Sequence, residues 1–293
     1  MIAIETRDLV KTYKDTRAVD GVTLSLEEGR IYGLLGRNGA GKTTLMKLLT
    51  GQIFASRGEM KLLGQHPVEN AEVLAQTCFI QESQRYPDTF RARDVFKVAA
   101  AIYPAWDSDF AEQLVEDFRL PVKRGMKKLS RGQLSAVGII VGLASRAPLT
   151  FFDEPYLGLD AVARQKFYDR LLADYAEHPR TIVLSTHHID EAANLLEHVV
   201  VIDDGHILLN CDTDELRGSA LHIAGQSAAV DALSADRTVY AREQIGGLAS
   251  ATIAAQEGDA ERAEASGLTV TPVSLQNLIV HLTTQAERSS VAA

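Results

Sequence analysis

Residues 36–43 read GRNGAGKT and decide the fold of this chain of 293 residues. They fit the pattern G-x-x-x-x-G-K-[ST], in which glycines let successive backbone N–H groups turn toward a phosphate. The apolar run Arg30–Leu35 before the pattern predicts a buried strand, and Thr44–Leu49 after it has helical period. A helix that starts here points its positive N-terminus at the loop. The stretch therefore predicts a nucleotide-binding phosphate loop, made of Gly36, Arg37, Asn38, Gly39, Ala40, Gly41, Lys42, Thr43 and Thr44.

Two side chains of this loop have their own chemistry. Lys42 is expected to reach the outer phosphates, where its ammonium group offsets their charge. The hydroxyl of Thr43 is expected to be a ligand of Mg²⁺. The loop thus predicts a nucleotide together with its metal ion.

A second apolar run ends in two carboxylates. Leu149–Phe152 predicts a buried parallel strand, and Asp153 and Glu154 follow it directly. Because ligands bind beyond the carboxyl ends of such strands, Asp153 is expected to hold Mg²⁺, directly or through water. Glu154 is expected to orient and deprotonate the attacking water. Taken alone the pair could equally be a solvated turn before Pro155, and the phosphate loop upstream favours the catalytic interpretation.

Composition limits the possible functions. Lys plus Arg is 30 and Asp plus Glu is 39, so the net charge of −9 argues against coating of nucleic acid. Cys78 and Cys211 have no metal-ligand spacing. The start of the chain has no pattern of a signal peptide, and apolar runs such as Val137–Leu143 are shorter than the ~20 residues of a membrane helix. We therefore expect a chain that does not span a membrane.

Strands alternate with helices over most of the chain, which predicts an α/β fold with a largely parallel sheet. Near residue 217 the composition shifts to Ala, Ser and Gly, with short alternating strands. The predicted organisation has one domain at 1–217, a small α+β appendage at 218–286, and a flexible tail at 287–293.

The pentapeptide LSRGQ at Leu129–Gln133 resembles the signature motif of ABC-type ATPases, and the resemblance covers about residues 2–216. It implies a P-loop NTPase fold of ABC type, with a β-subdomain and a helical subdomain at about 83–147. Tyr13 is similar to the aromatic residue that stacks on adenine. Asp160 lies in a loop similar to the one that communicates across the dimer, and His187 resembles the switch histidine at the γ-phosphate, with His188 as the weaker candidate.

The same resemblance implies a mechanism with two subunits. Each ATP, with Mg²⁺, would lie between the phosphate loop of one cassette and Ser130, Gly132 and Gln133 of the other. These residues open a predicted helix, whose N-terminus favours a phosphate. The expected partners are a second nucleotide-binding subunit, identical or different, and an integral membrane permease, with no nucleic acid. The expected location is cytoplasmic, at the inner face of the cell membrane.

One position departs from the family pattern. The family has a glutamine that contacts Mg²⁺ and the permease after the next strand, within Cys78–Ser83 here. Counting back from Phe90–Asp94 aligns Glu82 with it, and a slip of one residue would give Gln81 instead. Glu82 would add negative charge beside the metal. The following stretch, Arg85–Arg93, is expected to face the permease.

The run Asp153–Asp160 resembles cassettes of the drug, bacteriocin and lantibiotic exporter type. Export of a drug, peptide or lipid-like cargo is therefore expected over import, and the cargo stays open, as does the role of 218–286. The alternative is a soluble ABC-type ATPase that acts on ribosomes or nucleic acid, but no second cassette or heptad run appears. A cassette that binds ATP without hydrolysing it is disfavoured by Glu154 and His187.

Overall fold

The computed structural model describes residues 1–82 and 84–291, with side chains up to residue 284. Position 83, where the predicted helical subdomain begins, and positions 292 and 293 of the predicted tail lie outside the described residues. The chain divides into two compact units: Met1–His187 with Leu195–Leu209, and His188–Asn194 with Asn210–Ala293. No helix within the described part combines the length and the apolar character needed to cross a membrane.

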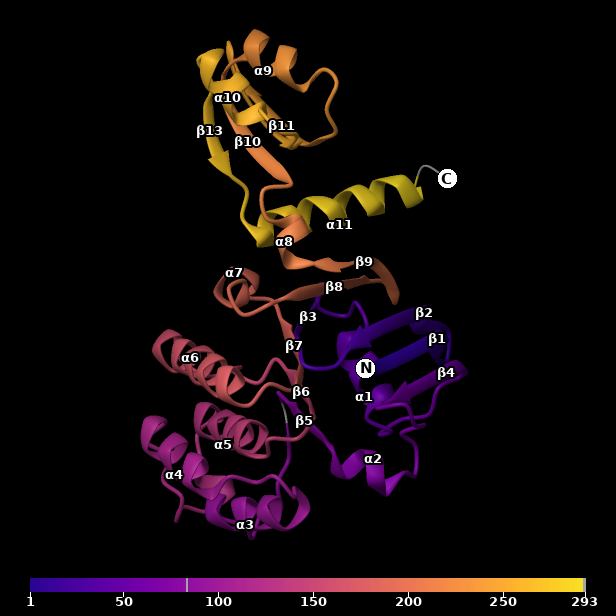
Figure 1. Ribbon diagram of the computed structural model, residues 1–293, viewed down its shortest axis with the longest axis vertical. Helices are drawn as coiled ribbons and strands as arrows, with labels where there is room; N and C mark the ends of the chain where they lie inside the picture. Colours follow the sequence, from indigo (N-terminus) through magenta and orange to yellow (C-terminus); the bar gives the residue numbers. More distant parts are fainter. Residues whose placement is uncertain (83, 292–293) are drawn as a thin grey trace. The chain divides into compact units, whose positions relative to one another are not determined.

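A six-stranded sheet forms the centre of the first unit (Figure 1), and five of its strands are mutually parallel. All five residues of β3 (Ile31–Leu35) and all five of β6 (Leu149–Asp153) are buried, which explains their continuous apolar sequence. In spatial order the strands are β5 (Thr77–Gln81), β6 (Leu149–Asp153), β7 (Thr181–Thr186), β3 (Ile31–Leu35), β8 (His198–Asp203) and β9 (His206–Asp212).

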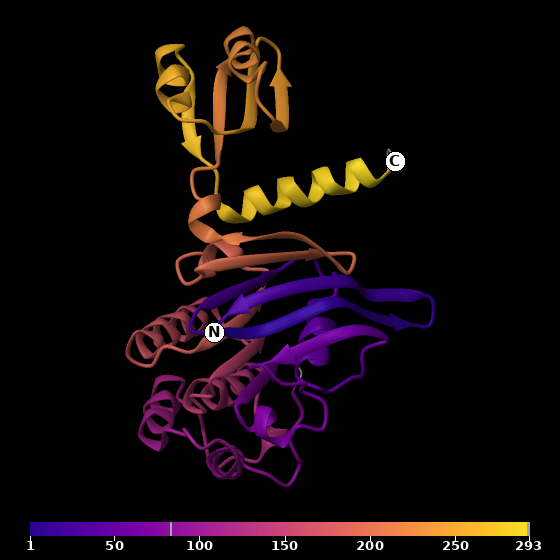
Figure 2. The same cartoon turned by 45° about the vertical axis from the view of Figure 1, so that its right-hand side comes forward.

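An antiparallel sheet of order β2-β1-β4 packs beside this centre (Figure 2). Its strands are β1 (Ile2–Tyr13), β2 (Thr16–Glu27) and β4 (Arg57–Leu62). In β2, Val22, Leu24 and Leu26 are buried while their neighbours are exposed, as expected of a sheet with one covered face. The hydrophobic core formed between the sheets also takes in helix α1 (Lys42–Leu49).

Helices cover the other side of the central sheet (Figure 1). They are α3 (Ala92–Ile102), α4 (Ser108–Asp117), the 3-10 turn η1 (Met126–Lys128), α5 (Arg131–Ala144) and α6 (Ala161–Glu177). The short helix α2 (Ala71–Ala75) lies instead on the side of α1, and its Val73 belongs to the core between the sheets. Helix α3 ends at Ile102, because Tyr103 precedes Pro104 and a residue before proline favours the extended backbone that Tyr103 adopts. Asp107 then caps α4 by accepting a hydrogen bond from the N–H of Phe110 at 2.8 Å.

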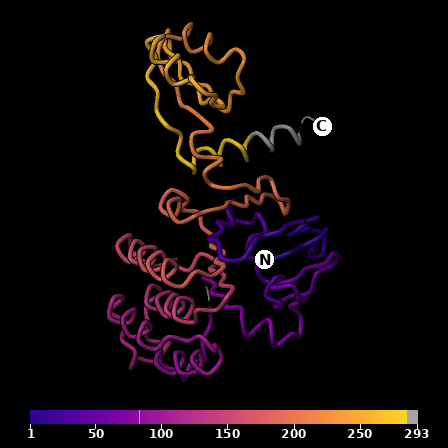
Figure 3. Tube along the Cα trace, viewed as in Figure 1, coloured from indigo at the N-terminus to yellow at the C-terminus, as the bar shows by residue number. Residues whose placement is uncertain are grey.

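The second unit contains a β-α-β-β-α-β segment whose four strands are all antiparallel, in the order β11-β12-β10-β13. This order and connectivity are those of a ferredoxin-like fold, and Figure 3 shows the orange and yellow parts of the trace returning to one body. Its elements are β10 (Ala220–Gln226), α9 (Ser227–Ser234), β11 (Val239–Ile245), β12 (Leu248–Ala254), α10 (Asp259–Ala265) and β13 (Thr269–Pro272). The remaining helices of this unit are α7 (Ile189–Ala192), α8 (Thr213–Leu216) and α11 (Leu275–Val291).

The predicted fold class, an ABC-type α/β cassette with a small α+β appendage, is confirmed. Two details differ from the sequence analysis. The unit that contains the predicted appendage also takes in residues 210–217 and His188–Asn194, which the sequence analysis placed in the domain at 1–217. Residues 287–291, predicted as part of a flexible tail, continue α11. No glycine or proline interrupts this stretch, so nothing in the local sequence ends the helix earlier.

A buried ion pair holds the second unit together. The carboxylate of Asp259, fully buried, accepts two hydrogen bonds from Arg237, both at 3.0 Å, and one from Arg262 at 2.6 Å. The N–H of Gln256 adds a fourth at 2.8 Å. The hydrogen bonds from Arg237 in particular hold the pKa of Asp259 below its usual value.

Close packing of α5 on the sheet gives a first prediction. A Cβ at Gly142 would lie 2.4 Å from the ring of Phe152, which is fully buried. Gly142→Ala should therefore destabilise the protein by about 1 kcal/mol or more, the cost of overpacking less the gain in helix propensity. Urea unfolding followed through Trp106 in the same unit measures it. Gly247→Ala, where no atom lies within 4 Å, is the control. Equal free energies of unfolding for the Gly142 and Gly247 variants would contradict the close packing of α5 on Phe152.

Asp259 gives a prediction about pH. A carboxylate whose folded pKa is lowered contributes stability above its unfolded pKa of about 4, and loses it as the pH falls through the folded value. The urea midpoint of the second unit, followed through the methyl signals of Ile253, should thus fall between pH 7 and 3. Asp259→Asn should lower the midpoint at pH 7 and flatten its acid dependence. Parallel pH curves for the variant and the natural chain would show that this ion pair does not matter.

Candidate active site

The phosphate loop can be built only with glycine at two positions. A Cβ at Gly36 would lie 2.1 Å from the carbonyl oxygen of Ile202, and one at Gly41 would lie 2.3 Å from that of Ala18. Both glycines also have positive φ, 153° and 110°. The loop is therefore pressed against β8 and β2, with its backbone fixed before any ligand arrives.

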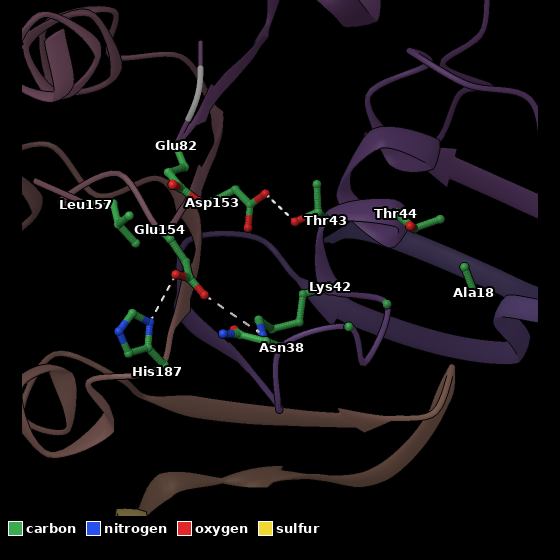
Figure 4. Close-up of a pocket in the computed structure, with 12 residues that line it drawn as sticks. Ala18, Asn38, Lys42, Thr43, Thr44, Glu82, Asp153, Glu154, Leu157 and His187 are labelled. Carbon is green, nitrogen blue, oxygen red and sulfur yellow. Dashed lines mark hydrogen bonds and ion pairs between the residues drawn. The ribbon is translucent and has the colours of Figure 1, made fainter. Parts of the chain in front are cut away.

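A cavity of about 570 Å³ opens over this loop (Figure 4). Side chains from the ends of neighbouring parallel strands converge there, as the sequence predicts. The lining residues are Ala18, Asn38, Gly39, Gly41, Lys42, Thr43, Thr44, Glu82, Asp153, Glu154, Leu157 and His187. Ala18 and Leu157 are the two that the sequence analysis did not single out.

Asp153, 5% exposed, is fixed by two hydroxyl groups. Thr43 donates to Oδ2 and Ser185 donates to Oδ1, each at 2.6 Å. A carboxylate and a hydroxyl this close form the hard-oxygen donor set that Mg²⁺ prefers, so these residues fit the metal. Ser185 is missed by the sequence analysis as a site residue, although it stands in the Ser185-Thr186-His187 stretch used to locate the switch histidine.

Glu154 lies between a cation and an imidazole. Its Oε1 is 4.0 Å from Nζ of Lys42, and its Oε2 is 3.0 Å from Nδ1 of His187, which must donate because a carboxylate can only accept (Figure 4). The backbone of Glu154 has φ of 47°, in the left-handed region that non-glycine residues rarely occupy. Such strain gathers at functional positions, where it aims a side chain that a relaxed strand end would direct elsewhere.

Lys42 is folded back over its own loop. Its Nζ donates to the carbonyl oxygens of Gly36 at 2.7 Å and of Arg37 at 3.0 Å. Burial lowers the pKa of Lys42, and the charges of Glu154 and Asp153 oppose that change. The ammonium group thus lies inside the cavity with opposite charge on both sides, where an anionic ligand would compete for it.

The side chain of Tyr156 packs beside that of His187. Its hydroxyl is hydrogen-bonded to the hydroxyl of Thr186, and its ring centre lies 6.2 Å from that of His187. Burial raises the pKa of Tyr156, so the phenol stays a neutral hydrogen-bonding group. No local pattern predicts this contact, because Tyr156 follows β6 while Thr186 ends β7, and only the fold brings them together.

A second cavity, of about 430 Å³, holds a separate group of predicted residues. Ser130, Gly132, Gln133 and Asp160 line it, and none of them lines the first cavity. Ser130 and Gln133 form a reciprocal capping box at the start of α5, with bonds of 3.2 and 3.0 Å. Asp160 caps α6 by accepting from the N–H of Ala163 at 2.8 Å. Two helix N-termini therefore open on one cavity, an arrangement that favours an anion.

Glu82 lies on the wall of the first cavity, where its carboxylate is ion-paired with Arg131 at the start of α5. Gln81, the alternative at this position, is the last residue of β5 and pairs with Asp153 in the sheet. Of the two candidates, Glu82 lines this cavity and Gln81 does not.

Other predicted residues lie outside the cavity wall. Tyr13 ends β1 with 47% of its surface exposed and Nζ of Lys11 at 4.9 Å from its ring centre. Gly36, Arg37 and Ala40 shape the loop without lining the cavity.

Comparisons with known proteins agree with this geometry. Residues 19–157 match the family model described as "ABC transporter". The chain is 30% identical to the bacitracin transport ATP-binding protein BcrA of Bacillus licheniformis, over 73% of this chain and 71% of that protein. It is 30% identical to the daunorubicin/doxorubicin resistance ATP-binding protein DrrA of Streptomyces peucetius, over 74% and 67%. A solved ATP-binding subunit of an ABC transporter matches with a TM-score of 0.66 and 25% identity, over 73% of this chain and 91% of that one.

The position of Lys42 gives a prediction about binding. Lys42→Ala removes the buried ammonium group, so the affinity for ATP with Mg²⁺ should fall at least about tenfold, or 1.4 kcal/mol. Isothermal titration calorimetry measures it. Lys47→Ala, in the last turn of the same helix and away from the cavity, is the control. If both variants bind ATP as the natural chain does, the nucleotide does not use this loop.

Proposed function

The chain belongs to the family of ABC transporter ATP-binding proteins, and from this premise we propose that two such subunits hydrolyse ATP at shared sites to drive a separate membrane permease. The chain is an ATPase of this family. The roles of individual residues, the pairing of subunits and the partner in the membrane are proposed in addition.

Hydrolysis is assigned to Glu154, and its place between Lys42 and His187 is the observation that carries the assignment. A carboxylate in this place can orient a water molecule and accept its proton. His187 holds the carboxylate in position by its hydrogen bond and can turn its other nitrogen to a phosphate oxygen. Lys42 offsets the charge of the outer phosphates. Mg²⁺, when held by Thr43 and Asp153 with Glu82 nearby, neutralises phosphate charge.

Two copies would complete each other's sites. One cavity holds the loop and carboxylates, and the other holds two helix N-termini with Ser130 and Gly132, so each provides what the other does not. A head-to-tail pair with two-fold symmetry joins both kinds of cavity twice. Because this chain carries both kinds of cavity, two identical copies would suffice to form both shared sites. ATP bound between them would hold the pair closed, and hydrolysis would release it.

The permease is assigned to the helical face of the first unit. A groove of about 470 Å³ lies between α3 and α4, lined by the neighbouring rings of Phe96 and Trp106 and by the charged residues Arg93, Lys97, Glu112 and Glu116. The groove lies beside the Arg85–Arg93 stretch that follows Glu82. A short helix of the permease with an apolar face would fill it, so movement of this face would accompany changes at Glu82.

Export of an amphipathic drug or peptide is the proposed direction of transport. The relatives named for bacitracin transport and for daunorubicin/doxorubicin resistance support it. The permease would hold the subunit at the inner face of the cell membrane. The alternative action on ribosomes or nucleic acid has no support from these relatives or from the net charge of −9.

The Glu154→Gln variant tests the assignment of Glu154 as the base in hydrolysis. Glu154→Gln keeps the shape of the side chain and removes its basicity, so ATP hydrolysis should fall about 10²- to 10⁴-fold while ATP binding is kept. Phosphate release and calorimetry measure the two separately. Glu177→Gln, an exposed carboxylate at the end of α6, should hydrolyse normally. Hydrolysis by the Glu154 variant at the natural rate would move the role of base to another residue.

A further inference from the structure

The second unit contains a polar cavity of its own, of about 450 Å³. The cavity lies between the start of α11 and the face of the ferredoxin-like sheet that α9 and α10 do not cover. Residues 271–273, which precede α11 in the chain, also line it. This volume is within the range of small-molecule sites. The polar residues around it are His222, Arg242, Glu243, Ser250, Thr252, Thr271, Asn277 and His281.

The sheet side of this cavity is polar by its register. Ile223, Ala251 and Ile253 belong to the apolar core under α9 and α10, so the alternate residues His222, Ser250 and Thr252 face the other way. His222 pairs with Thr252 on one neighbouring strand and with Thr271 on the other, which makes one polar row across three strands. Nδ1 of His222 lies 3.2 Å from the hydroxyl of Thr252. The helix adds Asn277 and His281 on the opposite wall.

These groups select for hydroxyl-rich ligands. Imidazole, hydroxyl and carboxamide groups each donate and accept hydrogen bonds, which suits a ligand whose hydroxyls do the same. A largely aliphatic ligand would leave them desolvated without partners, at a cost for each one.

Within the described part of the chain, the charged residues that line the cavity leave a negative charge without a partner. Arg242 donates to Asp231 at 2.7 and 3.1 Å, so its positive charge is already matched. Glu243, on the same strand, makes no ion pair within the described residues. The uncompensated charge beside the cavity is therefore negative, which favours an ammonium group on the ligand.

The helix over this cavity is joined to the segment that follows the switch histidine. Residues 188–194 belong to the same compact unit as α11, and they directly follow His187 in the chain. Asp190 accepts a hydrogen bond from the N–H of Gln276, in the first turn of α11, at 3.1 Å. Arg217 donates to the carbonyl oxygen of Ala193 at 2.9 Å. A ligand that shifts α11 at Asn277 and His281 would move the residues next to His187.

We propose that this cavity is an effector site for a small polyhydroxylated amine, and that α11 and α7 transmit its occupancy to the switch segment. The binding part is independent of the proposed hydrolysis, whereas the transmission part rests on it. Binding and ATPase rate are therefore measured separately, so a failure of one is not mistaken for a failure of the other.

The binding test uses the full chain with glucosamine and, as a matched neutral probe, glucose. Calorimetry should show saturable binding of one glucosamine per chain, with glucose at least about tenfold weaker because it lacks the ammonium group. Glu243→Gln should weaken glucosamine at least about tenfold. Glu261→Gln makes the same charge change on α10, outside the cavity, and should leave binding unchanged. No saturable binding, equal binding of the two sugars, or an unaffected Glu243 variant would overturn the site.

The transmission test measures ATP hydrolysis by the same protein. Saturating glucosamine should change the rate at least about twofold, and glucose at the same concentration should not. Asp190→Ala removes the bond to α11, so the variant should still bind glucosamine and lose the response. Binding without any change in rate would overturn the effector role, and an unchanged response in the Asp190 variant would overturn its route.

Discussion

The hydrogen bond from Thr43 to Asp153 is the contact on which the site depends, because it joins the helix after the phosphate loop to the strand that leads into Asp153 and Glu154. The two residues are far apart in the chain and meet because β3 and β6 flank β7 in one parallel sheet, so that their carboxyl ends lie at the same edge. Burial of these strands on both faces fixes that edge, and the glycines of the loop let its backbone fit against β8. The strain at Glu154 persists because this surrounding structure holds it.

Local patterns predicted the parts of the site that are local in sequence. The phosphate loop needs glycines and a lysine at fixed spacing, the acids follow their apolar strand directly, and Ser130 caps its own helix. Contacts between distant segments had no such pattern. The ring contact of Tyr156 with His187 and the ion pair of Glu82 with Arg131 join segments that meet only in the folded chain. The order of strands in the second unit, and its inclusion of residues 188–194, also depend on long-range pairing that composition cannot reveal.

In the proposed function, the nucleotide-binding groups are divided between two cavities, and this is why the chain would act in pairs. The first concentrates charge: Glu154 lies within ion-pair distance of the buried Lys42 and within hydrogen-bonding distance of His187, and Glu82 and Asp153 line the same cavity. The second is lined by Ser130, Gly132 and Gln133 at the start of α5 and by Asp160 at the start of α6, and these two helix N-termini can stabilise a phosphate. In the proposed mechanism, this separation would make hydrolysis conditional on association. The hydrogen bond between α11 and Asp190 would link the proposed effector site to the segment after His187.

The central claim is that one ATP is shared by two chains. A crystal structure of the Glu154→Gln variant with ATP and Mg²⁺ tests it most directly, through the distance from the γ-phosphate on one subunit to the hydroxyl of Ser130 on the other. The account predicts a two-fold pair with this distance near 3 Å, within hydrogen-bond range. A nucleotide enclosed by one chain alone, with Ser130 of every copy away from any phosphate, would contradict it.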